Sequence, residues 1–268
     1  MPTINHAEEN SALGLVRKVR DLGIAVPEAV NAEAKLYQDT RQEESRAGEA
    51  LRDASAKLAT VSLDEFDAAK QELVSASNRL FAVHNGLGDA LLNVAGERLL
   101  KAVYSATADW EAEAVARFNS IVDEFGLNEV AGDLPNLADV HNSGVLSLGR
   151  AQGEAVERWR NAADRLHPLW SAYTTIARLE GHDIGRVTAD SRSSGLVLAC
   201  RLGHPGTLGV ADAAATTFVS VSEGTDSAKR WGPLMPFVVP VLRGYELHLH
   251  TSDEAAAIRL EIQPGATG

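Results

Sequence analysis

The chain of 268 residues has a single cysteine, Cys200, so it cannot form a disulfide bond within itself. Aromatic residues make up only 5% of the sequence. No apolar run approaches the roughly 18 residues that a membrane-spanning helix needs. The N-terminus lacks a basic patch followed by an apolar stretch, which argues against a secretory signal peptide. We therefore expect a protein that is made in the cytoplasm and does not enter a membrane.

Basic residues are also scarce, because 25 Lys and Arg face 37 Asp and Glu and leave a net charge of −12. The imbalance is concentrated before Gly181, where 28 acidic residues accompany 18 basic ones. A surface of this sign repels phosphate groups. The charge therefore argues against general binding to nucleic acid or to anionic membranes.

What the sequence does contain is long stretches of apolar residues at helical spacing. From Phe66 onward they recur every seven positions, with a second set offset by three, which is the a and d pattern of a coiled coil. A second run with the same alternating spacing of three and four ends at Ile176. These runs supply the candidate interface residues Phe66, Leu73, Leu80, Leu87, Leu148, Trp159, Leu166 and Tyr173.

Local signals indicate where these helices begin, turn and end. Ser62 and Glu65 have the spacing of a capping box at a helix start. The stretch Asn85-Gly86-Leu87-Gly88 predicts a tight turn between antiparallel helices. Pro168 predicts a kink or restart inside the second run, and Gly181 is placed to end it as the residue after the C-cap.

After Gly181 the spacing changes to the alternation of apolar and polar residues that is typical of strands. The predicted strands are Leu196–Leu202, Thr217–Ser222, Phe237–Leu242, Tyr245–Thr251 and Ile258–Gln263. The sequence thus predicts an α+β fold in which the two kinds of structure are segregated. Residues 1–181 would form a helical bundle or coiled coil, and residues 182–268 a small, mostly antiparallel β domain.

Two histidines provide the candidate metal site. On a strand, His248 and His250 would face the same side, with Glu254 close behind as a third ligand. The arrangement partly resembles the first metal motif of the cupin family, a Gly followed by His-x-His and then Glu, although Gly244 lies closer to His248 than in that motif. The competing interpretation is an antiparallel strand whose solvent face carries Glu246, His248 and His250.

Two loops are candidate binding sites. Gly203, Gly206 and Gly209 have GxxGxxG spacing rather than the GxGxxG of a dinucleotide site, and Pro205 removes a backbone donor, so we expect no cofactor. Trp231 lies in a loop rich in Pro and Gly that also holds Met and Phe. Such residues are enriched at interfaces, so this loop is either a contact for a protein partner or a cover for its own domain.

The helical seams and the lack of a catalytic motif favour a non-enzymatic assembly protein that forms homo-oligomers and contacts other protein subunits. A helical stalk with a β head is common in phage tail and head accessory proteins, and this architectural analogy suggests a component of a bacteriophage virion. Two alternatives stay open. One is a metal-binding domain or metalloenzyme that uses His248 and His250. The other is a helical adaptor or secreted effector that binds a protein partner through the β domain.

Overall fold

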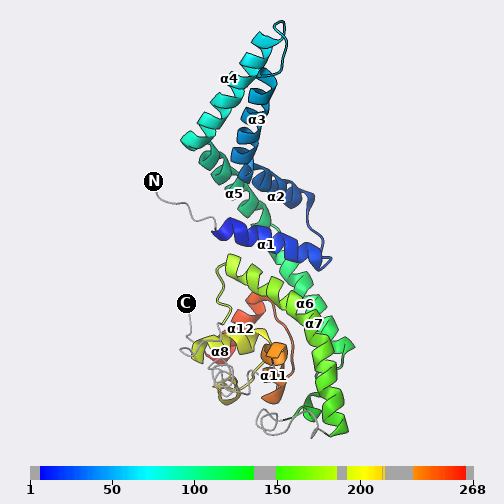
Figure 1. The fold of residues 1–268 in the computed structure, drawn as a ribbon. Coiled ribbons are helices and arrows are strands. Elements are labelled where there is room, and N and C mark those ends of the chain that lie inside the picture. The colour runs from blue at the N-terminus through cyan, green and yellow to red at the C-terminus, as the bar shows by residue number, and fades with distance from the viewer. Residues whose placement is uncertain (1–6, 136–148, 186–191, 213, 215–231, 264–268) are drawn as a thin grey trace. The chain divides into compact units, whose positions relative to one another are not determined.

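The computed structural model describes residues 7–135, 149–185, 192–212, 214 and 232–263 (Figure 1). Within these ranges the regular structure is helical and contains no strand. The chain divides into two compact units. Unit 1 comprises Met1–Arg20 and Ala25–Ala106, and unit 2 comprises Asp21–Ile24 and Thr107–Gly268. The boundary expected near Gly181 coincides instead with the end of a helix inside unit 2.

The helices of unit 1 pack mainly in pairs. They are α1 (Ala7–Asp21), α2 (Glu28–Arg41), α3 (Glu43–Leu58), α4 (Phe66–Ala82) and α5 (Gly88–Tyr104). Helix α2 packs on α5, and α3 packs on α4 as an antiparallel hairpin (Figure 1). Larger apolar side chains are buried on α1, α2 and α5, among them Leu15, Val16, Val30, Tyr37, Leu99 and Val103. The core of this unit therefore lies at the end opposite the α3–α4 hairpin tip.

The predicted break at Asn85 and Gly86 is confirmed, but the arrangement around it differs from the prediction. A single wide turn, η1 (Val83–Leu87), joins α4 to α5, and Gly86 leaves the helical conformation with φ +100°. A positive φ suits glycine, which has no Cβ to clash. Helix α5 continues away from α4, and the antiparallel neighbour of α4 is α3 (Figure 1). The glycine thus bends a long helical path without reversing it.

The other predicted helix boundaries had mixed outcomes. Helix α4 begins at Phe66, so Ser62 does not cap it, and the Ser62 hydroxyl instead lies 3.3 Å from the Glu65 carboxylate. Helix α7 (Arg150–Leu179) continues through Pro168 without ending. Its predicted end is confirmed, because Gly181 has φ +78° and the His182 amide donates to the Ala177 carbonyl at 2.8 Å.

Unit 2 has a core of large side chains. Its elements are α6 (Thr107–Glu124), η2 (Ala131–Asp133), α7, α8 (Arg192–Arg201), η5 (Gly232–Phe237), α11 (Val238–Leu242) and α12 (Ser252–Ile262). Helix α6 packs along α7, and α8 packs on α12. The side chains of Trp110, Phe118, Trp159, Leu166, Tyr173 and Phe237 are almost fully buried. None of the helices in the described ranges combines the length and apolarity that a membrane crossing requires.

The predicted β domain is wrong for the described residues. The predicted strands at Leu196–Leu202, Phe237–Leu242 and Ile258–Gln263 lie in α8, α11 and α12. The predicted strand Thr217–Ser222 lies outside the described residues, as do Leu148 and Trp231. A short apolar run does not distinguish a buried strand from a buried helix.

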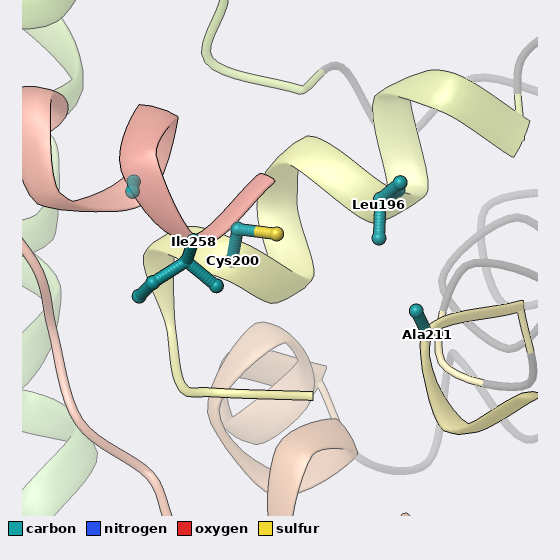
Figure 2. Close-up of a cluster of buried hydrophobic side chains, with 5 residues drawn as sticks. Leu196, Cys200, Ala211 and Ile258 are labelled. Carbon is teal, nitrogen blue, oxygen red and sulfur yellow. The ribbon is translucent and has the colours of Figure 1, made fainter. Parts of the chain in front are cut away.

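The packing of α8 against α12 explains the helical outcome. Leu196 and Cys200, four residues apart on α8, share one buried cluster with Ala255 and Ile258, three apart on α12. Figure 2 shows Cys200 beside Ile258. A capping box starts α12, because the Thr251 hydroxyl accepts from the Glu254 amide while the Glu254 carboxylate accepts from the Thr251 amide. Thr-Ser-Asp-Glu is a helix-start signature that the strand prediction overlooked.

Candidate functional site

The predicted heptad seam exists, but α3 of the same chain fills it. Ala47 and Ala54 of α3 and Ala69 of α4 are buried between the two helices. Leu73 and Leu80, two of the predicted interface residues, are half-buried along the same face of α4. The coiled-coil spacing therefore describes a contact within the chain, formed by small side chains that let the two helices approach closely.

Ion pairs flank this seam on the surface. Arg79 donates to Glu43 at 2.6 Å, Lys57 lies 2.6 Å from Glu72, and the His84 ring lies 3.0 Å from Glu44. The Lys57 and Arg79 side chains are each 56% exposed. Exposed pairs contribute about 0–1 kcal/mol each because water and salt screen them. The hairpin consequently has neither a large apolar core nor strong electrostatic links.

On α4 and α5, large apolar side chains also lie on the surface. On α4 these are Phe66, Val74 and Phe81, at 43%, 51% and 69% exposure. Leu87, the last residue of η1, is 45% exposed, and Leu91 and Val94 on α5 are 43% and 57% exposed. We call these six residues the α4–α5 stripe. The spacings are seven or eight on α4, and four then three from Leu87 into α5, so each set lies along one side of the helical path. Two predicted interface residues, Phe66 and Leu87, belong to the stripe.

The helices that carry the stripe are electrically balanced. Together α4 and α5 contain four acidic and four basic residues, whereas the whole chain has a net charge of −12. Apolar side chains exposed together at helical spacing are a recognised mark of a protein contact site. The stripe is therefore the best candidate interaction surface in the described part of the chain.

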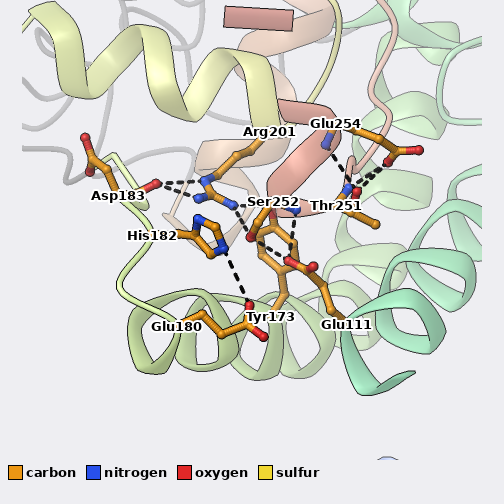
Figure 3. A network of polar contacts seen from close by, with 9 residues as sticks. All are labelled: Glu111, Tyr173, Glu180, His182, Asp183, Arg201, Thr251, Ser252 and Glu254. Carbon is orange, nitrogen blue, oxygen red and sulfur yellow. Dashed lines mark hydrogen bonds and ion pairs between the residues drawn. The ribbon is translucent and has the colours of Figure 1, made fainter. Parts of the chain in front are cut away.

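Unit 2 contains a buried polar cluster that the sequence did not predict (Figure 3). Four of its side chains come from four helices and are each at most 8% exposed: Glu111 on α6, Tyr173 on α7, Arg201 on α8 and Ser252 on α12. Arg201 donates to the Tyr173 hydroxyl and, at 3.1 Å, to the Ser252 hydroxyl. Ser252 in turn donates to Glu111 through its hydroxyl at 2.6 Å and its amide at 3.0 Å.

This cluster holds a buried cation and a buried carboxylate with one hydroxyl between them. Arg201 also donates twice to the Asp183 carbonyl, at 2.6 and 3.1 Å, so four of its five N–H groups have partners. Burial raises the pKa of Tyr173, and the nearby Arg201 cation partly opposes that rise. Buried charges are tolerated only when their hydrogen bonds are satisfied. The cluster thereby ties α6, α7, α8 and α12 to one another.

The predicted strand Tyr245–Thr251 has the alternating amide bonds of an extended segment, but among the described residues it belongs to no sheet. Its even-numbered amides bond to the end of α8: His248 donates to the Leu202 carbonyl at 3.0 Å, and His250 donates to the Arg201 carbonyl at 2.9 Å. The amides of a strand point alternately to its two sides, and this segment follows the same rule. Its alternation of residue types was read correctly, whereas the inferred neighbouring strands are absent from the described residues.

On the other side of the segment, two asparagine side chains make the hydrogen bonds that a neighbouring strand would have made. The Asn119 side chain accepts from the Leu249 amide at 2.8 Å and donates to the Leu249 carbonyl at 2.9 Å. Asn128 binds Leu247 in the same way, at 2.8 and 3.2 Å. The Leu247 and Leu249 side chains are buried in this arrangement. The segment is thereby held against the rest of unit 2.

The structure brings together two of the three predicted metal ligands. The His248 and His250 rings are 4.8 Å apart, but the Glu254 carboxylate is engaged with Thr251 in the capping box. Among the described residues, no three His, Cys, Asp or Glu side chains are arranged to hold a metal ion. Burial, assisted by the neighbouring His248, lowers the pKa of His250 to about 4. The buried Nε2 of His250 has no hydrogen-bond partner.

The remaining predicted residues lie in the protein interior. Trp159, Leu166 and Tyr173 are fully buried in unit 2, where they form its core rather than an exposed seam. Cys200 is also buried, and burial raises the pKa of its thiol to about 11. Because the thiolate is the reactive form, Cys200 is not prepared to act as a nucleophile. It is a small core residue, on a helix rather than on the predicted strand.

Comparison of the chain with protein-family models, with curated proteins and with solved structures finds no match. The bacteriophage virion role suggested by architectural analogy gains no support from these comparisons. The adaptor alternative was to act through a β domain, which is absent from the described residues.

Proposed function

We propose that the chain is a non-enzymatic assembly protein that associates with further copies of itself through the α4–α5 stripe. The observation that carries the proposal is the exposure of six large apolar side chains on α4, η1 and α5, helices that already pack other residues against the same chain. A helix that is apolar on two sides of its surface is unfavourable alone in water, because the second side has no core to face. A partner helix would cover it.

The stripe can supply part of the interface that this role requires. Helices α4 and α5 have 17 residues each, so each is about 25 Å long. A standard stable interface uses roughly 20–30 residues from each partner. One side of two such helices supplies only part of that number, so the interface would also include exposed residues beside the stripe.

The charge balance favours a second copy over a strongly charged partner. A complex between identical chains brings like surfaces together, and a surface with the chain's general negative charge would repel itself. Helices α4 and α5 avoid this repulsion because their acidic and basic residues are equal in number. A nucleic acid or a basic protein would find no complementary field on this face.

Light scattering on protein eluting from a size-exclusion column tests the proposal across a range of concentrations. The wild-type chain should be a dimer or larger, and the double variant Val74→Glu with Phe81→Glu should be a monomer with unchanged helix content. Both side chains are more than half exposed, so the substitutions should leave the fold intact. A matched control, Ser45→Glu with Ser55→Glu, adds the same charge to exposed positions of α3 outside the stripe and should stay oligomeric.

Two results would overturn self-association through the stripe. The first is a wild-type chain that remains monomeric at the highest concentration. The second is an oligomer that persists in the Val74/Phe81 variant, which would place the contact elsewhere in the molecule.

A further inference from the structure

Unit 2 contains a pocket of about 370 Å³ that is separate from the α4–α5 stripe. It lies between α8, α12 and the segment that follows α7. Its volume is within the range of pockets that hold small organic molecules. The lining residues that the structure describes all belong to unit 2.

The lining carries an excess of positive charge. Arg201 and Arg259 both line the pocket, and among the described lining residues Asp183 alone is acidic. The Asp183 side chain accepts a hydrogen bond from the Gly185 amide, and its carboxylate points away from the Arg201 guanidinium (Figure 3). His182 also lines the pocket, with its Nε2 3.7 Å from Glu180. The formal charges of the described lining residues therefore sum to one positive charge, and the Glu111 carboxylate that Ser252 contacts is not part of this lining.

Arg201 is held in a fixed orientation before any ligand arrives. It is 3% exposed, and its hydrogen bonds to Tyr173, Ser252 and the Asp183 carbonyl come from three directions (Figure 3). One N–H of Nη2 is left over from these bonds. A guanidinium that is already immobilised loses little freedom on binding, which favours recognition of an anion.

Arg259 supplies a second cation whose hydrogen-bonding capacity is incompletely used. Its Nε is buried and has no hydrogen-bond partner. Such an unsatisfied donor is unfavourable, and an acceptor oxygen on a ligand would relieve it. Arginine matches planar carboxylates particularly well, because its parallel N–H groups can bond both oxygens.

The rest of the pocket wall is apolar and selects among anions. Val197, Leu260 and two alanines of α12 lie along it. A phosphate with two negative charges would exceed the single surplus positive charge and would gain nothing from the apolar wall. From the two arginines and this wall we infer that the pocket binds a small organic monocarboxylate, with the carboxylate at Arg201 and Arg259 and an apolar body against α8 and α12.

Isothermal titration calorimetry with butyrate and benzoate as probes tests this inference on the full chain. Saturable binding of at least one of them is expected, and the uncharged butyramide should not bind. The variant Arg259→Gln should weaken binding about tenfold to a hundredfold, because it removes a hydrogen bond to a charged group. Arg160→Gln, an exposed arginine elsewhere on α7, should bind as the wild type does.

The titrations test the existence of the site and the class of its ligand separately. No saturable binding of either carboxylate, or equal binding by wild type and Arg259→Gln, would overturn the site. Binding of inorganic phosphate but of neither carboxylate would overturn the ligand class. Because Arg201 belongs to the buried cluster and its variants risk unfolding, the Arg259 variant carries the test. Oligomeric state plays no part in this readout, so the result is independent of the proposed function.

Discussion

The two units achieve stability in different ways. Helix α4 of unit 1 buries a single residue, Ala69, whereas α7 of unit 2 buries ten, including two large aromatic side chains. The ion pairs of the α3–α4 hairpin lie on its surface, but the Glu111–Ser252–Arg201 cluster lies inside unit 2. Unit 2 therefore has the interior of a self-sufficient domain, and the hairpin of unit 1 has the composition of an element that gains stability from a contact.

This difference implies unequal sensitivity to substitution. Local opening is expected where buried apolar contacts are few and backbone hydrogen bonds are exposed. The hairpin meets that description, and the core of unit 2 does not. The predictions below test the contrast at a buried charge, at a buried histidine and at a surface ion pair.

The largest expected effect is in the buried cluster of unit 2. Glu111→Ala should lower the free energy of unfolding by about 3 to 5 kcal/mol, because it leaves the Arg201 cation buried without its compensating carboxylate. Urea denaturation followed by circular dichroism measures this loss. Glu113→Ala, two residues away on α6 in an exposed pair with Arg117, should change the stability by no more than about 0.5 kcal/mol.

A similarly small loss of stability in Glu111→Ala and Glu113→Ala would contradict the difference between the two units. It would mean that the cluster is hydrated or rearranges easily, and that unit 2 does not depend on it more than unit 1 depends on its surface pairs.

The features that could be predicted from the sequence were those with a local physical cause. Gly181 ends α7 because a left-handed conformation there suits glycine, and the break at Gly86 has the same origin. The a and d spacing of α4 correctly marked the face that packs on another helix. It could not reveal that the other helix is α3 of the same chain, because heptad spacing specifies a seam and leaves its partner open.

The errors after Gly181 also have physical reasons. The alternation in Tyr245–Thr251 predicted an extended backbone, which is present, but Asn119 and Asn128 supply the bonds that a second strand would have made. Those asparagines lie about 120 residues earlier, so no local pattern could indicate them. The burial of Arg201 could not be predicted from the sequence either, because it depends on partners from three other elements. Only the capping box at Thr251 and Glu254 was a readable signal.

An intermediate effect is expected at His250 when the pH falls. The folded-state pKa of about 4 is below the ordinary value of 6.5, so between these values the unfolded chain binds a proton that the folded chain does not. This contribution to stability is complete above about pH 6.5 and is lost as the pH falls toward 4. His250→Gln should therefore equal the wild type at pH 7.5 and exceed it by about 1 to 2 kcal/mol at pH 4.5, after allowance for partial exposure.

Urea denaturation at the two pH values measures this difference, and His84→Gln in unit 1 is the matched control. The His84 side chain is 53% exposed, so its replacement should not bring a comparable gain in acid. If both variants gained equally at pH 4.5, the acid sensitivity would not be a property of the buried histidine, and this distinction between the units would fail.

The smallest expected effect is at the Arg79–Glu43 pair, the most favourable ion pair of the hairpin because two nitrogens of Arg79 bond the same carboxylate oxygen at 2.6 and 2.8 Å. A double-mutant cycle with Arg79→Ala and Glu43→Ala should give a coupling energy below about 1 kcal/mol. The Arg79 side chain is 56% exposed, so added salt should reduce the coupling further. A coupling above about 2 kcal/mol that resisted salt would show that this pair is shielded from water. The hairpin would then have a stabilising interaction comparable with the buried cluster of unit 2, and its need for a partner surface would be correspondingly weaker.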